Sequence, residues 1–62
     1  MTGKEYLMIF RENGLQRSKL VRFLENQIKI LDKNEIDSTE TKWIAIEVAE
    51  QEKTQGYPFL EE

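Results

Sequence analysis

Apolar residues recur at helical spacing in three segments of the chain, and the clearest of these is residues 16–33. At about 100° per residue, one side of this segment gathers its apolar residues and one glutamine: Leu20, Leu24, Gln27, Ile28 and Leu31, with Val21 on one flank and Phe23 and Ile30 on the other. The opposite side is a polar, mostly basic stripe: Lys19, Arg22, Asn26, Lys29 and Lys33. The pattern predicts a helix over about 16–33 with one apolar and one basic side.

Residues 3–13 lie between a start signal and a stop signal for a helix. Thr2 and Glu5 have the spacing of a capping box, in which each side chain accepts a hydrogen bond from the other residue's amide. Asn13 and Gly14 tolerate the left-handed backbone that ends helices, and Leu15 is the apolar residue that packs back on the last turn. The run 6–10 is apolar throughout, so a strand is the alternative here. The two capping signals favour a helix over about 3–13.

A third helix is predicted over about 38–54. Asp37 or Ser38 can cap its start, and Glu40 adds negative charge to the first turn. Its apolar stripe consists of Ile44, Ala45, Val48 and Ala49, with Trp43 and Ile46 towards the edges. Positions 44, 46 and 48 also alternate as in a strand, but the alanines and the polar continuation over 50–53 favour a helix. Gly56 and Pro58 end this element.

Together these segments predict a single all-α domain, residues 1–62, of three short helices, with 56–62 as an apolar C-terminal tail. The alternative is a strand–helix–helix chain with an N-terminal strand. In the connection 32–38, Ile36 is the residue that we expect to reach the core. A chain of 62 residues buries only about 60% of its unfolded surface, so marginal stability is expected. We expect a homodimer, because the apolar faces of the first two helices exceed what a short third helix can cover.

The chain contains neither cysteine nor histidine. These absences exclude disulfides, thiolate nucleophiles, thiolate or imidazole metal ligands and a histidine general base. Since no phosphate-binding loop is present either, an enzyme is the least expected class, and we predict no catalytic residue, metal or cofactor. Asp32, Asn34 and Asp37 lack the glycine and the third ligand of a calcium loop.

No segment approaches the roughly 20 apolar residues of a membrane span. The first residues lack the apolar run of a signal peptide. We therefore expect a cytoplasmic protein.

The net charge of −3 divides unequally along the chain. Residues 1–33 carry seven basic and four acidic side chains, a charge of +3, whereas residues 34–62 carry two basic and eight acidic ones, a charge of −6. Such asymmetry is typical of a basic binding face beside an acidic segment. It keeps nucleic-acid binding as a second hypothesis for this acidic protein.

Residues 14–26, with the sequence GLQRSKLVRFLEN, resemble the turn and recognition helix of a helix-turn-helix repressor. Gly14 and Leu15 match the turn glycine and the apolar residue after it, and Leu20 and Phe23 match the contacts of the second helix with the first. The first helix departs from the pattern, with Phe10 where a small residue is usual and a polar residue at position 13. The resemblance implies a DNA-binding transcriptional regulator, whose DNA-facing residues would be Gln16, Arg17, Lys19 and Arg22. From the basic stripe of the same helix, Lys29 would join them. A ribbon-helix-helix dimer, with 5–11 as the ribbon, is a further regulator geometry, but neither face of that ribbon is polar enough to read base edges.

The leading hypothesis is a small regulatory or adaptor protein that acts by protein–protein contact. Trp43 lies among acidic residues, as the aromatic anchor of an interface often does: Glu40, Glu47 and Glu50. The equal alternative is that Trp43 packs in the core as its largest residue. The apolar residues near the C-terminus either fold over the helices or dock on a partner as an extended peptide: Tyr57, Phe59 and Leu60. We therefore predict partner binding at these two groups of residues, with a second copy of the chain and an unidentified protein as partners.

Overall fold

The computed structural model describes residues 1–55, which form three helices: α1, Gly3–Glu12; α2, Lys19–Lys33; and α3, Thr39–Gln55. No strand occurs in this part of the chain, so the predicted all-α class is confirmed. The alternative of an N-terminal strand is wrong, and the ribbon of a ribbon-helix-helix dimer is wrong with it, because residues 5–11 lie inside α1. The second helix begins three residues later than predicted, since Ser18 is its N-cap and accepts from the Val21 amide. None of the three helices is both long and apolar enough to cross a bilayer.

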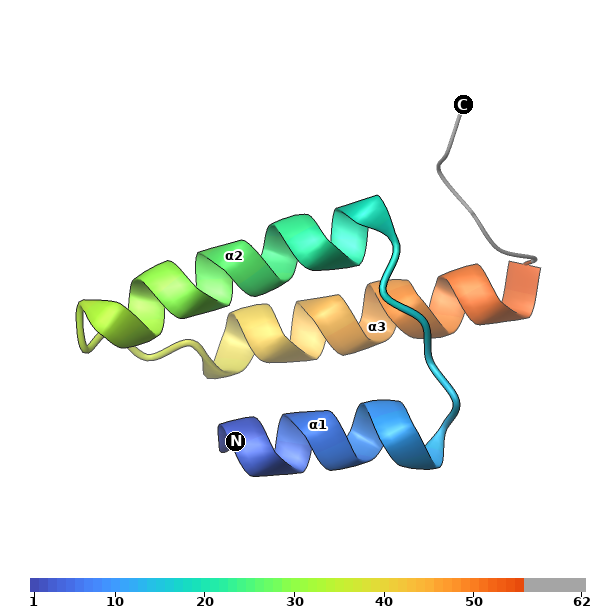
Figure 1. The fold of residues 1–62 in the computed structure, drawn as a ribbon, viewed down its shortest axis with the longest axis horizontal. Coiled ribbons are helices and arrows are strands. Elements are labelled where there is room, and N and C mark those ends of the chain that lie inside the picture. Colours follow the sequence, from blue (N-terminus) through green and yellow to red (C-terminus); the bar gives the residue numbers. More distant parts are fainter. Residues whose placement is uncertain (56–62) are drawn as a thin grey trace.

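The third helix lies between the other two. Figure 1 shows α1 (blue) on one side of α3 and α2 (green) on the other, with α2 running opposite to both. The molecule is flattened, with principal extents of 35 × 25 × 13 Å. The third helix, predicted over about 38–54, is confirmed within one residue at each end, and with 17 residues it is the longest of the three. Its central position means that it packs against two neighbours.

Both α1 and α2 end in the same hydrogen-bonded motif. Gly14 has a positive φ of 60°, and the Leu15 amide donates to the Phe10 carbonyl. Glu35 has a positive φ of 59°, and the Ile36 amide donates to the Leu31 carbonyl. This is the Schellman arrangement, which satisfies carbonyls that the helix leaves free. At the start of α1, Thr2 and Glu5 form both bonds of the predicted capping box.

Gly14→Ala tests the left-handed position at the end of α1. An L side chain at positive φ costs roughly 1–2 kcal/mol, so we expect a loss of about that size in the free energy of unfolding. The expected loss comes from the backbone, because the nearest atom to an added Cβ is the Lys53 Nζ at 3.6 Å. Gly3→Ala is the matched control, since nothing lies within 4 Å of its added Cβ and it starts a helix. Urea unfolding of both variants checks the prediction, and equal stability of the two would contradict it.

The core lies where the three helices and the connection after α1 meet. Its buried apolar residues are Tyr6, Phe10, Leu15, Val21, Ile28, Ala45, Ile46 and Ala49. The Tyr6 and Phe10 rings are tilted against each other with centroids 4.7 Å apart. Stacking of this kind adds to the apolar area that the two rings bury.

Several sequence-based assignments to the core are wrong. Ile46, placed towards the edge of its helix, is 3% exposed, whereas Ile44, placed on the apolar stripe, is 42% exposed. Ile36 was expected to reach the core and is 54% exposed. On α2 only Val21 and Ile28 are fully buried; Leu20, Leu24 and Leu31 are half-buried, and Gln27 is exposed. The predicted apolar face of α2 is therefore turned partly away from the core, because Val21 from its flank is fully buried, although Ile28 is in the core and Leu24 packs against it.

Candidate interaction surface

Trp43 lies on the surface of α3 beside the first helix. Its side chain is 52% exposed, although it is the only tryptophan in the chain. It lines a shallow depression of about 350 Å³ together with the first residue of the chain and three residues of α1: Met1, Glu5, Met8 and Ile9. Met8 is 46% exposed, so two large apolar side chains from different helices face solvent side by side. Sequence reasoning missed the α1 part of this surface.

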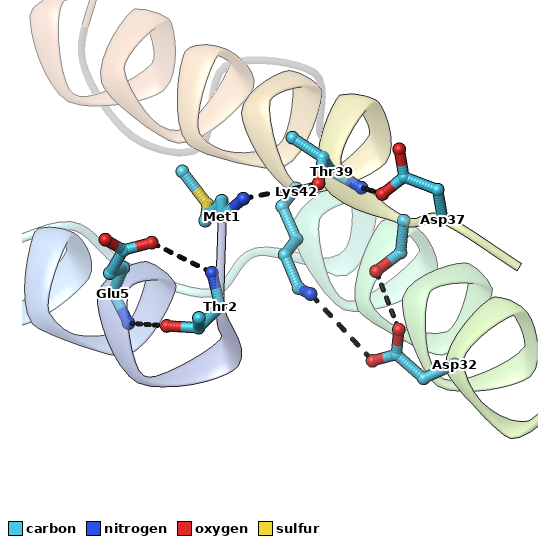
Figure 2. A network of polar contacts seen from close by, with 8 residues as sticks. Met1, Thr2, Glu5, Asp32, Asp37, Thr39 and Lys42 are labelled. Carbon is cyan, nitrogen blue, oxygen red and sulfur yellow. Dashed lines mark hydrogen bonds and ion pairs between the residues drawn. The ribbon is translucent and has the colours of Figure 1, made fainter. Parts of the chain in front are cut away.

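The start of α1 is held against the start of α3 (Figure 2). The Met1 amino group donates to the Thr39 Oγ1 at 3.3 Å. In the capping box, the Thr2 amide donates to the Glu5 Oε1 at 2.9 Å, and the Glu5 amide donates to the Thr2 Oγ1 at 3.1 Å. These bonds fix the first turn of α1, and with it the depression beside Trp43.

A second polar group joins the end of α2 to the start of α3. The Ser38 hydroxyl donates to the Asp32 Oδ1 at 2.7 Å, and the Lys42 Nζ lies 4.0 Å from the Asp32 Oδ2. Lys42 is itself only 7% exposed, and Figure 2 shows it reaching from α3 towards Asp32. Asp37 accepts from the Thr39 amide at 3.0 Å, and hydrogen bonds from Thr39 hold the pKa of this carboxyl below its usual value. The bonds from Met1 and from Asp32 thus hold the N-terminal turn of α3, next to Trp43, against the start of α1 and the end of α2.

The predicted acidic residues share a face with Trp43. Glu40, Glu47 and Glu50 are all exposed, and they lie three residues before and four and seven residues after Trp43 on α3. Residues at these spacings follow one side of a helix. With Glu5 on α1, carboxylates therefore surround the exposed tryptophan. We call this group, Trp43 with Met8, Glu5, Glu40, Glu47 and Glu50, the Trp43 surface.

The residues predicted to contact DNA do not form one group. Gln16, Lys19, Arg22 and Lys29 are exposed, but the Arg17 Nε donates to the Glu25 Oε2 at 2.8 Å. The Arg17 guanidinium also stacks on the Phe10 ring, 4.5 Å from its centroid, so this arginine covers the core. The connection between α1 and α2 is residues 13–18, longer than the turn of about three or four residues in a helix-turn-helix. In Figure 1, α3 lies between the two helices that the motif would pack together.

Glu25 accepts a second hydrogen bond from α1. The Tyr6 hydroxyl donates to its Oε2 at 2.6 Å, so Tyr6 and Arg17 share one carboxylate oxygen. Burial raises the pKa of Tyr6 well above its usual value, and the bond to Glu25 and its negative charge raise it further, while Arg17 opposes the change. The neutral phenol is thus the stable form and serves as a structural donor between α1 and α2.

A buried pair of polar residues was missed from the sequence. Ser18 is 2% exposed and donates to the Glu52 Oε2 at 2.9 Å, and Glu52 is 3% exposed. Within residues 1–55, the Glu52 Oε1 has no hydrogen-bond partner. Glu52 follows Ala45 and Ala49 at helical spacing and lies with them on the buried side of α3.

The remaining predicted partner-binding residues, Tyr57, Phe59 and Leu60, lie outside the described residues. In residues 1–55, no group of three or more acidic side chains is arranged to hold a metal ion. No family model, curated protein or solved structure matches the chain, so its own residues have to indicate its function.

Proposed function

We propose that this protein is a small regulatory or adaptor protein that is not an enzyme and binds another protein through the Trp43 surface. One observation carries the proposal: the single tryptophan is half-exposed on α3, beside an exposed methionine and among four carboxylates. Tryptophan anchors are enriched among the residues that dominate binding energy in interfaces. The proposal takes the protein to act in the cytoplasm.

The charges around Trp43 indicate the kind of partner. Glu5, Glu40, Glu47 and Glu50 favour a basic segment, because complementary charge steers association and disfavours partners of the same sign. The depression beside Trp43, between α1 and α3, fits an apolar side chain of such a segment, and the flexible Met8 side chain can adapt to its shape. We therefore expect the partner to present an apolar anchor flanked by lysine or arginine.

Capture of a partner by the immobilised full-length chain tests this proposal. We expect Trp43→Ala to abolish capture from a cell extract while the far-ultraviolet circular dichroism stays helical, because a half-exposed side chain contributes little to the core. Leu7→Ala is the matched control, since Leu7 is 51% exposed on α1 but does not line the depression beside Trp43. Binding should also shift the emission of the single tryptophan. Equal capture by Trp43→Ala would contradict the proposal.

The same preparations address DNA binding by the basic side of α2. A salt-sensitive gel shift with duplex DNA that is lost in a Lys19→Ala, Arg22→Ala double variant would show DNA binding by α2. That result would overturn the proposed function. Both side chains are exposed, so their removal should leave the fold unchanged.

A further inference from the structure

The outer side of α2 is an apolar face that the other helices leave uncovered. Phe23 and Ile30 are 57% and 53% exposed, and half-buried leucines lie beside them. We call this set the outer face of α2: Leu20, Phe23, Leu24, Gln27, Ile30 and Leu31. The positions repeat at intervals of three and four residues, as in a helix that packs along another helix. Gln27 is the only polar residue in the set.

The apolar surface continues onto neighbouring residues. Ile36 is 54% exposed, and its amide donates to the Leu31 carbonyl. These two residues are the C″ and C3 positions of the Schellman motif, whose side chains often contact each other. On α3, Ile44 is 42% exposed and Val48 is half-buried. At about 100° per residue, these two lie on the flank of α3 away from Trp43. Several large apolar side chains exposed on one small domain are typical of an interaction site.

We propose that the outer face of α2 binds the same face of a second copy of this chain, with the two α2 helices antiparallel and crossing at Gln27. Such a pair has two-fold symmetry, in which every contact occurs twice. Positions three residues either side of Gln27 are Leu24 and Ile30, and positions four residues either side are Phe23 and Leu31. Apolar residues therefore meet apolar residues at all four places. This surface is separate from the Trp43 surface.

The polar and charged positions fit a second copy as well. An amide both donates and accepts, so two Gln27 side chains on the symmetry axis bond to each other. Buried polar residues of this kind set the register of paired helices. Eight residues either side of Gln27 stand Lys19 and Glu35, both exposed, so each lysine lies opposite the other copy's glutamate. Charge complementarity across the same axis favours self-pairing over a partner of one charge sign.

Charge at the axis gives a direct test. The parent chain should sediment as a dimer of twice its 7.4 kDa mass at millimolar concentration and dissociate towards micromolar concentration. Gln27→Glu places two like charges on the axis and should raise the dissociation constant at least about tenfold, and Gln27→Lys should do the same. Mixing the two variants should restore a dimer, because the charges then attract. Circular dichroism should remain unchanged, since Gln27 is exposed in the single chain.

Each outcome of this sedimentation test either supports or overturns the proposed dimer. Dimers in the parent and in the mixture, but not in either variant alone, support the symmetric pairing. Leu7→Glu, at an exposed residue of α1, is the control that should dimerise like the parent. A mass of 7.4 kDa at every concentration overturns the proposal. The same mass would result if residues 57–60 covered this face within one chain, so that arrangement overturns the proposal as well. A Gln27→Glu variant that dimerises as well as the parent overturns it too, because the interface then lies elsewhere.

Discussion

Phe10→Ala is expected to cause a large loss in the free energy of unfolding. The ring is 2% exposed, stacks on Tyr6 and lies under the Arg17 guanidinium, so its removal leaves a cavity bounded by α1 and the connection to α2. Truncation of a buried phenylalanine costs about 3–5 kcal/mol. At about 0.05–0.15 kcal/mol per residue, a 62-residue domain has roughly 3–9 kcal/mol of total stability. The expected loss is therefore at least about a third of the total stability and at most all of it.

Phe23→Ala is the matched control for Phe10→Ala. It removes the same atoms from a side chain that is 57% exposed on the outer face of α2. At micromolar concentration, where the single chain prevails, we expect its free energy of unfolding to fall by less than about 1 kcal/mol. Thermal and urea unfolding followed by circular dichroism measure both variants. Similar losses for the two would show that the core is not where the structure places it.

Local signals in the sequence predicted both ends of α1, whereas the start of α2 was placed three residues too early. The capping box of Thr2 and Glu5 and the stop at Gly14 with Leu15 packed behind it are confirmed. These features depend on hydrogen bonds between residues a few positions apart, so the sequence alone specifies them. The strand alternative for residues 6–10 was wrong. An apolar run by itself does not distinguish a helix from a strand, whereas the capping signals on both sides favour a helix.

The buried side of α3 could not be predicted in the same way. A helix between two others buries a wide arc, and that of α3 extends from Glu52 through Ala45, Ala49 and Lys42 to Ile46. Two members of this arc are alanines and two are charged, so the most apolar positions of the helix do not mark its centre. Ile44 is more apolar than Ala49 but lies beyond the arc. Which side faces inward depends on the packing of α1 and α2.

The candidate site was predicted in part. Trp43 and the three glutamates could be grouped from helical spacing, but a tryptophan in the core was an equal alternative until its exposure was known. Met8 and Ile9 join the site only because α1 lies against α3, a contact between segments distant in sequence. The same holds for Ser18 and Glu52, which lie 34 residues apart in the chain.

Ser18→Ala is expected to have a larger effect than the loss of one hydroxyl suggests. The Ser18 Oγ caps α2 by accepting from the Val21 amide, and it donates to the Glu52 Oε2. Loss of an N-cap costs about 0.5–2 kcal/mol, and a buried group left unpaired costs about 1–3 kcal/mol. Because the Glu52 Oε1 already lacks a partner within residues 1–55, the variant leaves both oxygens unpaired. We expect a loss of about 2–4 kcal/mol in the free energy of unfolding.

Two comparisons separate the buried carboxylate from the cap. Ser38→Ala changes an equally buried serine, but its acceptor, Asp32, has a side chain that is 53% exposed, so water replaces the bond and the loss should be about 1 kcal/mol. Combining Ser18→Ala with Glu52→Leu removes the unpaired carboxylate and should recover part of the stability, leaving mainly the loss of the cap. Urea unfolding of the single and double variants gives the coupling energy between Ser18 and Glu52. A coupling near zero would mean that Glu52 does not depend on Ser18, and the cost of Ser18→Ala would then belong to the start of α2 alone.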